Sequence, residues 1–98
     1  MALCDESATN LARKLRRGDI SSRELTESVL ARIEERDEVT NAFITVTRDE
    51  ALKAADRADE RFRSAKATPP PPLNGLPVAL KDNLCTQGVR TTCAARIL

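Results

Sequence analysis

The stretch 76-LPVALKDNLC-85 carries the strongest structural signal in the chain. A short apolar run follows the Asn74-Gly75 turn signal and leads directly into a lysine, an aspartate and an asparagine. This pattern predicts a buried strand over 76–81, with Pro77 near its start, where a missing N–H is tolerated. The sequence therefore predicts that Lys81 projects from the end of a buried strand.

The alternation of a strand decides what surrounds this lysine. Lys81 and Asn83 share one face, and Asp82 points to the other, so the adjacent carboxylate is poorly placed to pair with the ammonium. Desolvation without a counter-ion lowers the pKa of a lysine. A neutral lysine is a competent base for a hydroxyl nucleophile, as in Ser-Lys enzymes. Strand geometry alone fits this interpretation or a lysine whose ammonium extends into solvent.

Helices are predicted upstream of this strand. Apolar residues at helical spacing predict a helix over 7–17, and Gly18 is a residue typical of a helix end. Ser21 and Glu24 have the spacing of a capping box, which predicts that a second helix begins there and continues to residue 36. These helices carry mixed charges on faces that we expect to be solvated.

The pattern then changes three times. Residues 42–47 are β-branched and apolar, which predicts a strand. Residues 48–65 have an apolar stripe of mostly alanine, which predicts a helix that approaches its neighbour closely. Four consecutive prolines in 66–75 predict an extended spacer. The predicted order is therefore helix, helix, strand, helix, strand.

The composition excludes several classes of function. The 98 residues suffice for one small domain, and a formal net charge of +1 offers no electrostatic footprint for nucleic acid or an acidic membrane. Three cysteines and no histidine provide neither a disulfide framework nor a zinc site, so we expect no metal and a reducing, cytoplasmic setting. No signal peptide or membrane-spanning segment is evident, and we expect a soluble chain.

The segment 75-GLPVALKDNLCTQGVRTTCA-94 resembles the opening half of the amidase-signature family, whose motif is G-[IVL]-P-x-x-[LIV]-K-D-N followed by T-x-G-x-x-T-T. Residues 20–44 also resemble the N-terminal helical region of that family. The matching motif positions are Gly75, Leu76, Pro77, Lys81, Asp82, Asn83, Thr86, Gly88, Thr91 and Thr92.

The resemblance implies a fold class and a domain plan. The family fold is an α/β/α sandwich around a mixed sheet, and residues 1–98 would be the N-terminal part of such an amidase domain. Residues 7–65 would form a helical region with one strand, 66–75 a proline-rich linker, and 76–98 the strand and loop of the lysine. The sheet would be incomplete within these residues.

Within the family, Cys85 and the run 90-RTTC-93 look most like the A subunit of tRNA-dependent amidotransferases. The resemblance implies that the complete subunit hydrolyses glutamine through an acyl-enzyme and releases ammonia. The ammonia would serve a complex with B and C subunits, which uses ATP and magnesium to amidate misacylated Glu-tRNA(Gln) or Asp-tRNA(Asn). No cofactor is expected in this chain. A free-standing amidase with another amide substrate is the alternative.

By the same resemblance, Lys81 is the lysine of a Ser-Ser-Lys triad, and Asp82 and Asn83 support its loop. The family's catalytic serines belong to a Gly/Ser-rich signature that these 98 residues do not contain, so we expect the chain itself to be inactive. The serines of the helical region are interpreted as caps or solvated helix positions: Ser21, Ser22, Ser28 and Ser64.

Two further readings of the sequence stay open. Ala95 stands where the family usually has a serine, which removes a hydroxyl from the loop. A truncated, non-enzymatic remnant of the family is one alternative. A helical module that binds a partner through residues 7–65 would leave the 75–94 motif unexplained.

Overall fold

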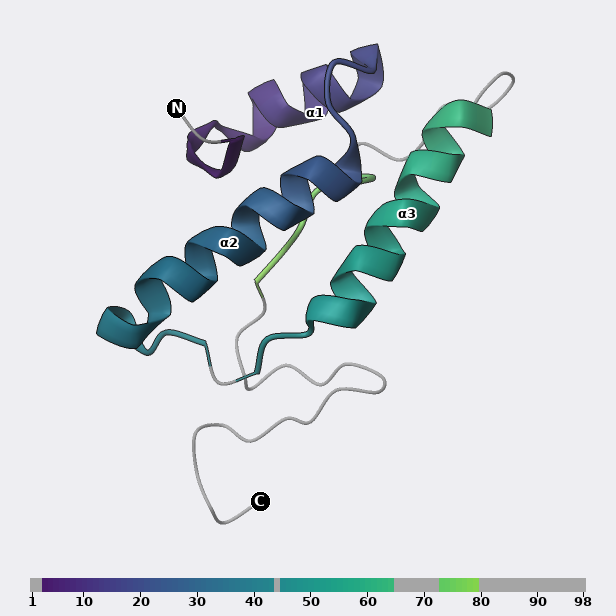
Figure 1. Cartoon of the computed structure of the whole chain (residues 1–98). Coiled ribbons are helices and arrows are strands. Elements are labelled where there is room, and N and C mark those ends of the chain that lie inside the picture. The colour runs from purple at the N-terminus through teal and green to yellow at the C-terminus, as the bar shows by residue number, and fades with distance from the viewer. Residues whose placement is uncertain (1–2, 44, 65–72, 80–98) are drawn as a thin grey trace.

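The computed structural model describes residues 3–43, 45–64 and 73–79. They form the short 3-10 helix η1 (Leu3–Asp5) and the α-helices α1 (Ala8–Arg17), α2 (Ser22–Thr40) and α3 (Arg48–Ser64). Helices α2 and α3 pack together, α1 crosses near the start of α2, and residues 73–79 run between α2 and α3 (Figure 1).

Helix α1 begins and ends where the sequence predicts. The Ser7 hydroxyl accepts a 3.2 Å hydrogen bond from the backbone N–H of Asn10. At the other end, Gly18 adopts a left-handed conformation with φ of 79°, and the N–H of Asp19 donates to the carbonyl of Lys14. Both ends satisfy backbone groups that a helix terminus leaves unpaired, so the prediction for 7–17 is confirmed.

Helix α2 confirms the predicted cap but is longer than predicted. The Ser21 hydroxyl accepts from the N–H of Glu24 at 3.0 Å, as the capping-box spacing requires. The helix continues past residue 36 to Thr40 because no glycine or proline interrupts it. It ends at Asn41, which is left-handed with φ of 48° and donates its N–H to the carbonyl of Asp37 at 2.7 Å.

Helix α3 spans Arg48–Ser64, and residue 65 of the predicted 48–65 lies outside the described residues. Ala55 and Ala58, from the predicted stripe, are its buried residues. Their small side chains permit close packing between α3 and α2, as the sequence predicts.

The strand predicted over 42–47 is absent from its described residues, 42–43 and 45–47. Instead, the Asp37 carboxylate accepts hydrogen bonds from the backbone N–H groups of Ala42 and Phe43, at 2.8 and 3.2 Å. Phe43 and Val46 stay 37% and 42% exposed. A β-branched run forms a strand only beside a partner strand, and the described chain offers none.

The predicted strand over 76–81 is likewise not formed in its described part, residues 76–79, and the rest lies outside the described residues. The mixed sheet therefore remains an expectation. The turn before it is confirmed: the N–H of Leu76 donates to the carbonyl of Leu73 at 3.2 Å, and Gly75 has φ of 88°. Positive φ at the third position of a turn favours glycine.

A small core joins the helices to this turn. Leu11 and Leu15 of α1 and Leu25 of α2 form a buried cluster, against which Phe62 of α3 and Leu76 pack. Leu25 is fully buried, and burial of one leucine contributes about 1.5–3 kcal/mol. The core thus contacts Leu76, the first residue of the strand predicted to lead to the lysine.

Candidate active-site segment

The three predicted site residues, Lys81, Asp82 and Asn83, lie outside the described residues. The structure does describe residues 73–79, which end two positions before Lys81. We call them the approach segment. Because they lead directly into the lysine, their attachment to the helices is the part of the candidate site that can be built from contacts.

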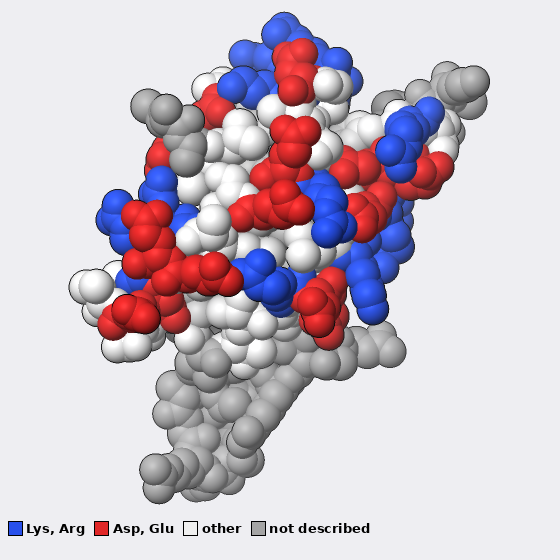
Figure 2. Space-filling model, in the orientation of Figure 1, with Lys and Arg blue, Asp and Glu red and all other residues white. Residues whose placement is uncertain are grey.

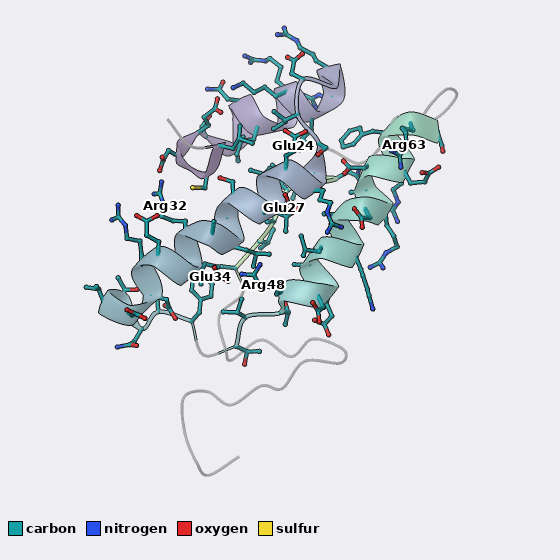
Figure 3. All side chains as sticks on the ribbon, in the orientation of Figure 1. Glu24, Glu27, Arg32, Glu34, Arg48 and Arg63 are labelled. Atoms are coloured by element: carbon teal, nitrogen blue, oxygen red, sulfur yellow. The ribbon has the colours of Figure 1, made fainter. Side chains whose placement is uncertain are left out.

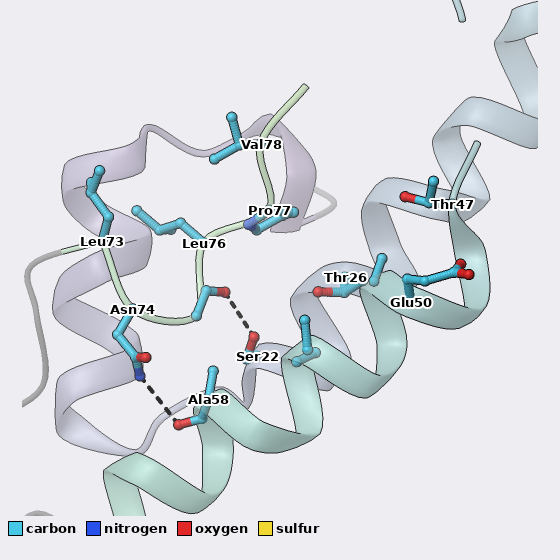
Figure 4. Close-up of a pocket in the computed structure, with 14 residues that line it drawn as sticks. Ser22, Thr26, Thr47, Glu50, Ala58, Leu73, Asn74, Leu76, Pro77 and Val78 are labelled. Atoms are coloured by element: carbon cyan, nitrogen blue, oxygen red, sulfur yellow. Dashed lines mark hydrogen bonds between the residues drawn. The ribbon is translucent and has the colours of Figure 1, made fainter. Parts of the chain in front are cut away.

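Three hydrogen bonds hold the approach segment to the helices, and Figure 4 shows two of them. The Ser22 hydroxyl, at the start of α2, donates to the carbonyl oxygen of Gly75 at 2.8 Å. The side-chain amide of Asn74 donates to the carbonyl oxygen of Ala58 in α3 at 3.2 Å. The exposed guanidinium of Arg61 in α3 donates the third bond, to the side-chain oxygen of Asn74 at 3.4 Å. The segment is therefore bonded to both long helices, and all three bonds lie within its turn.

Gly75 sits in a socket made by three helices. A Cβ placed on Gly75 would lie 3.2 Å from Cε2 of Phe62, 3.3 Å from Cδ1 of Leu15 and 3.3 Å from Cβ of Ser22. These three side chains, from α3, α1 and α2, are what we call the Gly75 socket. Both the positive φ and the close neighbours favour glycine at this position, which is the first position of the sequence motif.

Ser22 is itself held in place by α3. The carboxylate of Asp59 accepts the backbone N–H of Ser22 at 2.6 Å and that of Arg23 at 3.2 Å. A carboxylate at a helix N-terminus satisfies unpaired donors and complements the helix dipole. Ser22 is 1% exposed, and the hydrogen bond to Gly75 satisfies its buried hydroxyl.

An ion pair between Arg23 and Asp56, at 2.8 Å, adds to this junction of α2 and α3. The carboxylate of Asp56, followed by the hydrogen bond to Glu27, raises the pKa of Arg23. The stabilisation from a raised pKa is present below the unfolded pKa and is lost as pH rises through the folded one. For an arginine this window lies in strong alkali, so the pair contributes no pH dependence near neutrality.

Charges elsewhere on the surface are paired in the same way. Hydrogen bonds to Asp5 and Glu60 raise the pKa of Arg32 and of Arg63, respectively. Figure 3 shows these arginines on separate helices, Arg32 on α2 and Arg63 on α3. Figure 2 shows acidic and basic side chains interleaved over α2 and α3, as expected for solvated faces.

A groove of about 490 Å³ lies between α3, the start of α2 and residues 73–78. The described residues that line it are mostly alanine, leucine, proline and valine, and among them only Glu50 has an ionisable side chain. These described residues do not provide a set of acid, base and nucleophile. No group of side chains within 3–43, 45–64 and 73–79 could hold a metal ion, and none of the helices described is long and apolar enough to cross a membrane.

The sequence interpretation misses the part that Ser22 plays. Because Ser21 satisfies the capping box, the pattern leaves the second serine as a cap or a solvated position. A signal is present nonetheless: Ser22 shares a helix face with Leu25 and Thr26, three and four residues later, and all three are buried.

The family model described as Amidase matches residues 24–98, and the chain belongs to the amidase family. Its curated relatives include the A subunits of glutamyl-tRNA(Gln) amidotransferases from several bacteria. The protein of Geotalea daltonii is 51% identical over 98 residues, which cover 100% of this chain and 20% of that protein. The protein of Alkalilimnicola ehrlichii is 49% identical over 94 residues, covering 96% of this chain and 19% of that protein.

The protein of Lachnospira eligens is 42% identical over 98 residues, again with 100% of this chain and 20% of that protein covered. This chain therefore spans about a fifth of the length of the curated relatives it matches. No solved structure matches it.

Proposed function

We propose that this chain is the N-terminal portion of the glutaminase subunit of a Glu-tRNA(Gln)/Asp-tRNA(Asn) amidotransferase. One observation carries the proposal: identity of 42–51% to A subunits of glutamyl-tRNA(Gln) amidotransferase over the whole chain. The free-standing amidase that the sequence left open is not favoured by these relatives. The complete subunit would release ammonia from glutamine, in the cytoplasm, for transfer to a misacylated tRNA.

In this proposal, Lys81 is the base of a Ser-Ser-Lys triad. Its neutral amine would accept the proton that leaves a serine hydroxyl as the hydroxyl oxygen attacks the amide carbonyl of glutamine. The lysine would return this proton to the amide nitrogen, so that the C–N bond breaks and ammonia leaves, and water would then hydrolyse the acyl-enzyme to glutamate and restore the serine. Asp82 and Asn83 would support the loop that carries the lysine. Both triad serines would come from the part of the longer relatives that lies outside these 98 residues.

The partners follow from the same proposal. The chain would assemble with B and C subunits, and the complex would use ATP and magnesium to activate the tRNA-bound acid. No residue of this chain is assigned to the binding of ATP or magnesium. The helical region would serve the complete subunit by holding the approach segment.

A chimera tests the proposal. Residues 1–98 replace the matching fifth of the Geotalea daltonii relative, and glutamate release from glutamine is measured in the assembled enzyme. We expect activity, and we expect Lys81→Ala and Lys81→Arg to abolish it, because arginine keeps its proton and cannot act as a base. Lys53→Ala, which changes an exposed lysine on α3, is the matched control and should retain activity.

Three results would decide against parts of this proposal. Full activity of the Lys81→Arg chimera would show that Lys81 is not the base. A folded chimera that hydrolyses simple amides but not glutamine would favour a free-standing amidase. Glutamate release by the isolated 98-residue chain would contradict the assignment of the serines to the longer chain.

Asp82 offers a further check on strand alternation. Its carboxylate is predicted to face away from Lys81, so Asp82→Asn should lower activity through loop order. A lower limb of the pH–rate profile displaced by more than about one unit would contradict that geometry.

A further inference from the structure

The hydroxyl of Ser22 has a partner that a capping serine would not have. It is buried, it lies in the first turn of α2, and it donates to the carbonyl of Gly75 rather than to its own helix. Figure 4 shows this bond crossing from α2 to the approach segment. The bonded carbonyl belongs to the residue at which the lysine motif begins, six positions before Lys81.

We infer that Ser22 is a positioning residue for Lys81, acting through the carbonyl of Gly75; the inference rests on the proposed function of the lysine as a base. Ser22 does not touch the reacting groups. It holds the approach segment at Gly75, and the residues that follow Gly75 lead to the lysine.

Register is the physical reason. Side chains alternate faces along a strand, so a slip of one residue turns every side chain to the opposite face. In the complete subunit, where we expect the predicted strand over 76–81 to pair, such a slip would put Leu80 or Asp82 at the position of Lys81. The bond from Ser22 and the close fit of Gly75 in its socket oppose the slip, because a Cβ at this position would force its neighbours to shift and the positive φ strains any residue but glycine.

Asp59 contributes to the same positioning through Ser22. Its carboxylate binds the backbone N–H of Ser22 at 2.6 Å and thereby fixes the serine against α3. Because Asn74 is bonded to Ala58, next to Asp59, the same turn of α3 contacts both Ser22 and the approach segment. A change at Asp59 should therefore move the lysine in the same direction as a change at Ser22, but less.

The test uses the chimera described above. Ser22→Ala should lower kcat for glutamine about tenfold, because small displacements of a catalytic group reduce the rate strongly. The KM for glutamine should change less than about twofold, since no substrate contact is lost. Ser28→Ala is the matched control: its hydroxyl lies in the same helix and accepts from the N–H of Cys4, far from the approach segment in sequence. It should leave kcat unchanged.

A second variant covers the case in which Ser22→Ala does not fold. Asp59→Asn keeps the shape of the side chain but opposes one of the two N–H donors with its own amide. It should lower kcat several-fold at unchanged KM. If the folded variants among Ser22→Ala and Asp59→Asn keep the kcat of the Ser28→Ala control, the inference is overturned.

Failure of the inference and failure of the proposed function give different results. If Lys81→Arg abolishes activity while Ser22→Ala and Asp59→Asn leave kcat intact, the lysine is the base and Ser22 does not position it. If Lys81→Arg is active, the proposed function of the lysine fails, and the positioning inference fails with it. If Lys81→Arg abolishes activity, and kcat falls in Ser22→Ala and Asp59→Asn but not in Ser28→Ala, the result supports both the proposed function and the positioning inference.

Discussion

The backbone N–H of Ser22 donates a 2.6 Å hydrogen bond to Oδ1 of Asp59, so a side chain of α3 caps the first turn of α2. The second carboxylate oxygen accepts from Arg23. Helix α2 thus has two caps of different origin: Ser21 from its own sequence and Asp59 from a helix 37 residues away. The second cap ties a local helix end to the packing of two helices.

Asp59→Ala should lower the free energy of unfolding by about 1 kcal/mol, as expected for loss of an N-terminal cap. The matched control is Asp56→Ala, one turn earlier on α3, where the carboxylate is 54% exposed and pairs with Arg23. That change should cost less than about 0.5 kcal/mol, as is typical of exposed ion pairs. Urea unfolding followed by circular dichroism measures both, and an equal cost for the two would show that Asp59 is not a cap.

Two glycines with positive φ separate conformational strain from crowding. A Cβ placed on Gly18, whose φ is 79°, would meet nothing within 4 Å, whereas a Cβ on Gly75 would meet three close neighbours. Gly18→Ala should cost about 1 kcal/mol from the left-handed backbone alone. Gly75→Ala should cost about 3 kcal/mol, because overpacking adds to the same strain. Thermal unfolding of both variants gives the comparison, and a larger loss for Gly18→Ala would contradict the socket.

Leu25→Ala should cost about 2–5 kcal/mol, because this side chain is fully buried in the cluster that joins α1 to α2. Val39→Ala, in the same helix, is the control. Val39 is 85% exposed, and its truncation should change the free energy of unfolding by less than about 0.5 kcal/mol. If both variants unfold at the same temperature, the core does not lie where the structure places it.

Amide exchange should distinguish the turn of the approach segment from its end. The N–H of Leu76 is bonded to Leu73, whereas Val78 is 71% exposed and, within the described chain, donates no backbone hydrogen bond. In the 98-residue chain we expect fast exchange at Val78 and slow exchange at Leu25, whose N–H is bonded to Ser21. Protection at Val78 equal to that of Leu25 would indicate a strand already paired.

The features that the sequence predicts correctly are those with local causes. The cap at Ser21, the stop at Gly18 and the turn at Gly75 each depend on residues within a few positions. The alanine stripe of α3 also follows from periodicity alone. These elements need no knowledge of distant partners.

The features that it misses depend on distant residues. The strand predicted over 42–47 is wrong for the residues described. A β-branched, apolar run does not reveal whether a neighbouring strand is present, and here Asp37 binds the backbone instead. The roles of Ser22 and Asp59 escape a local pattern because their partners are 53 and 37 residues away. Lys81, Asp82 and Asn83 rest on the family motif and remain predictions.

The Gly75 socket has a consequence for the nascent protein. Synthesis proceeds from the N-terminus, so α1, α2 and α3 leave the ribosome before Gly75 does. Closing a longer loop adds only a small entropic cost, so the helices can pair first and receive the turn afterwards. Until then, Leu15 and Phe62 lack the neighbour that covers them. A ribosome-bound chain that is halted when α3 has emerged but Gly75 has not should therefore present an apolar surface to chaperones. It should lose this surface when the next few residues emerge.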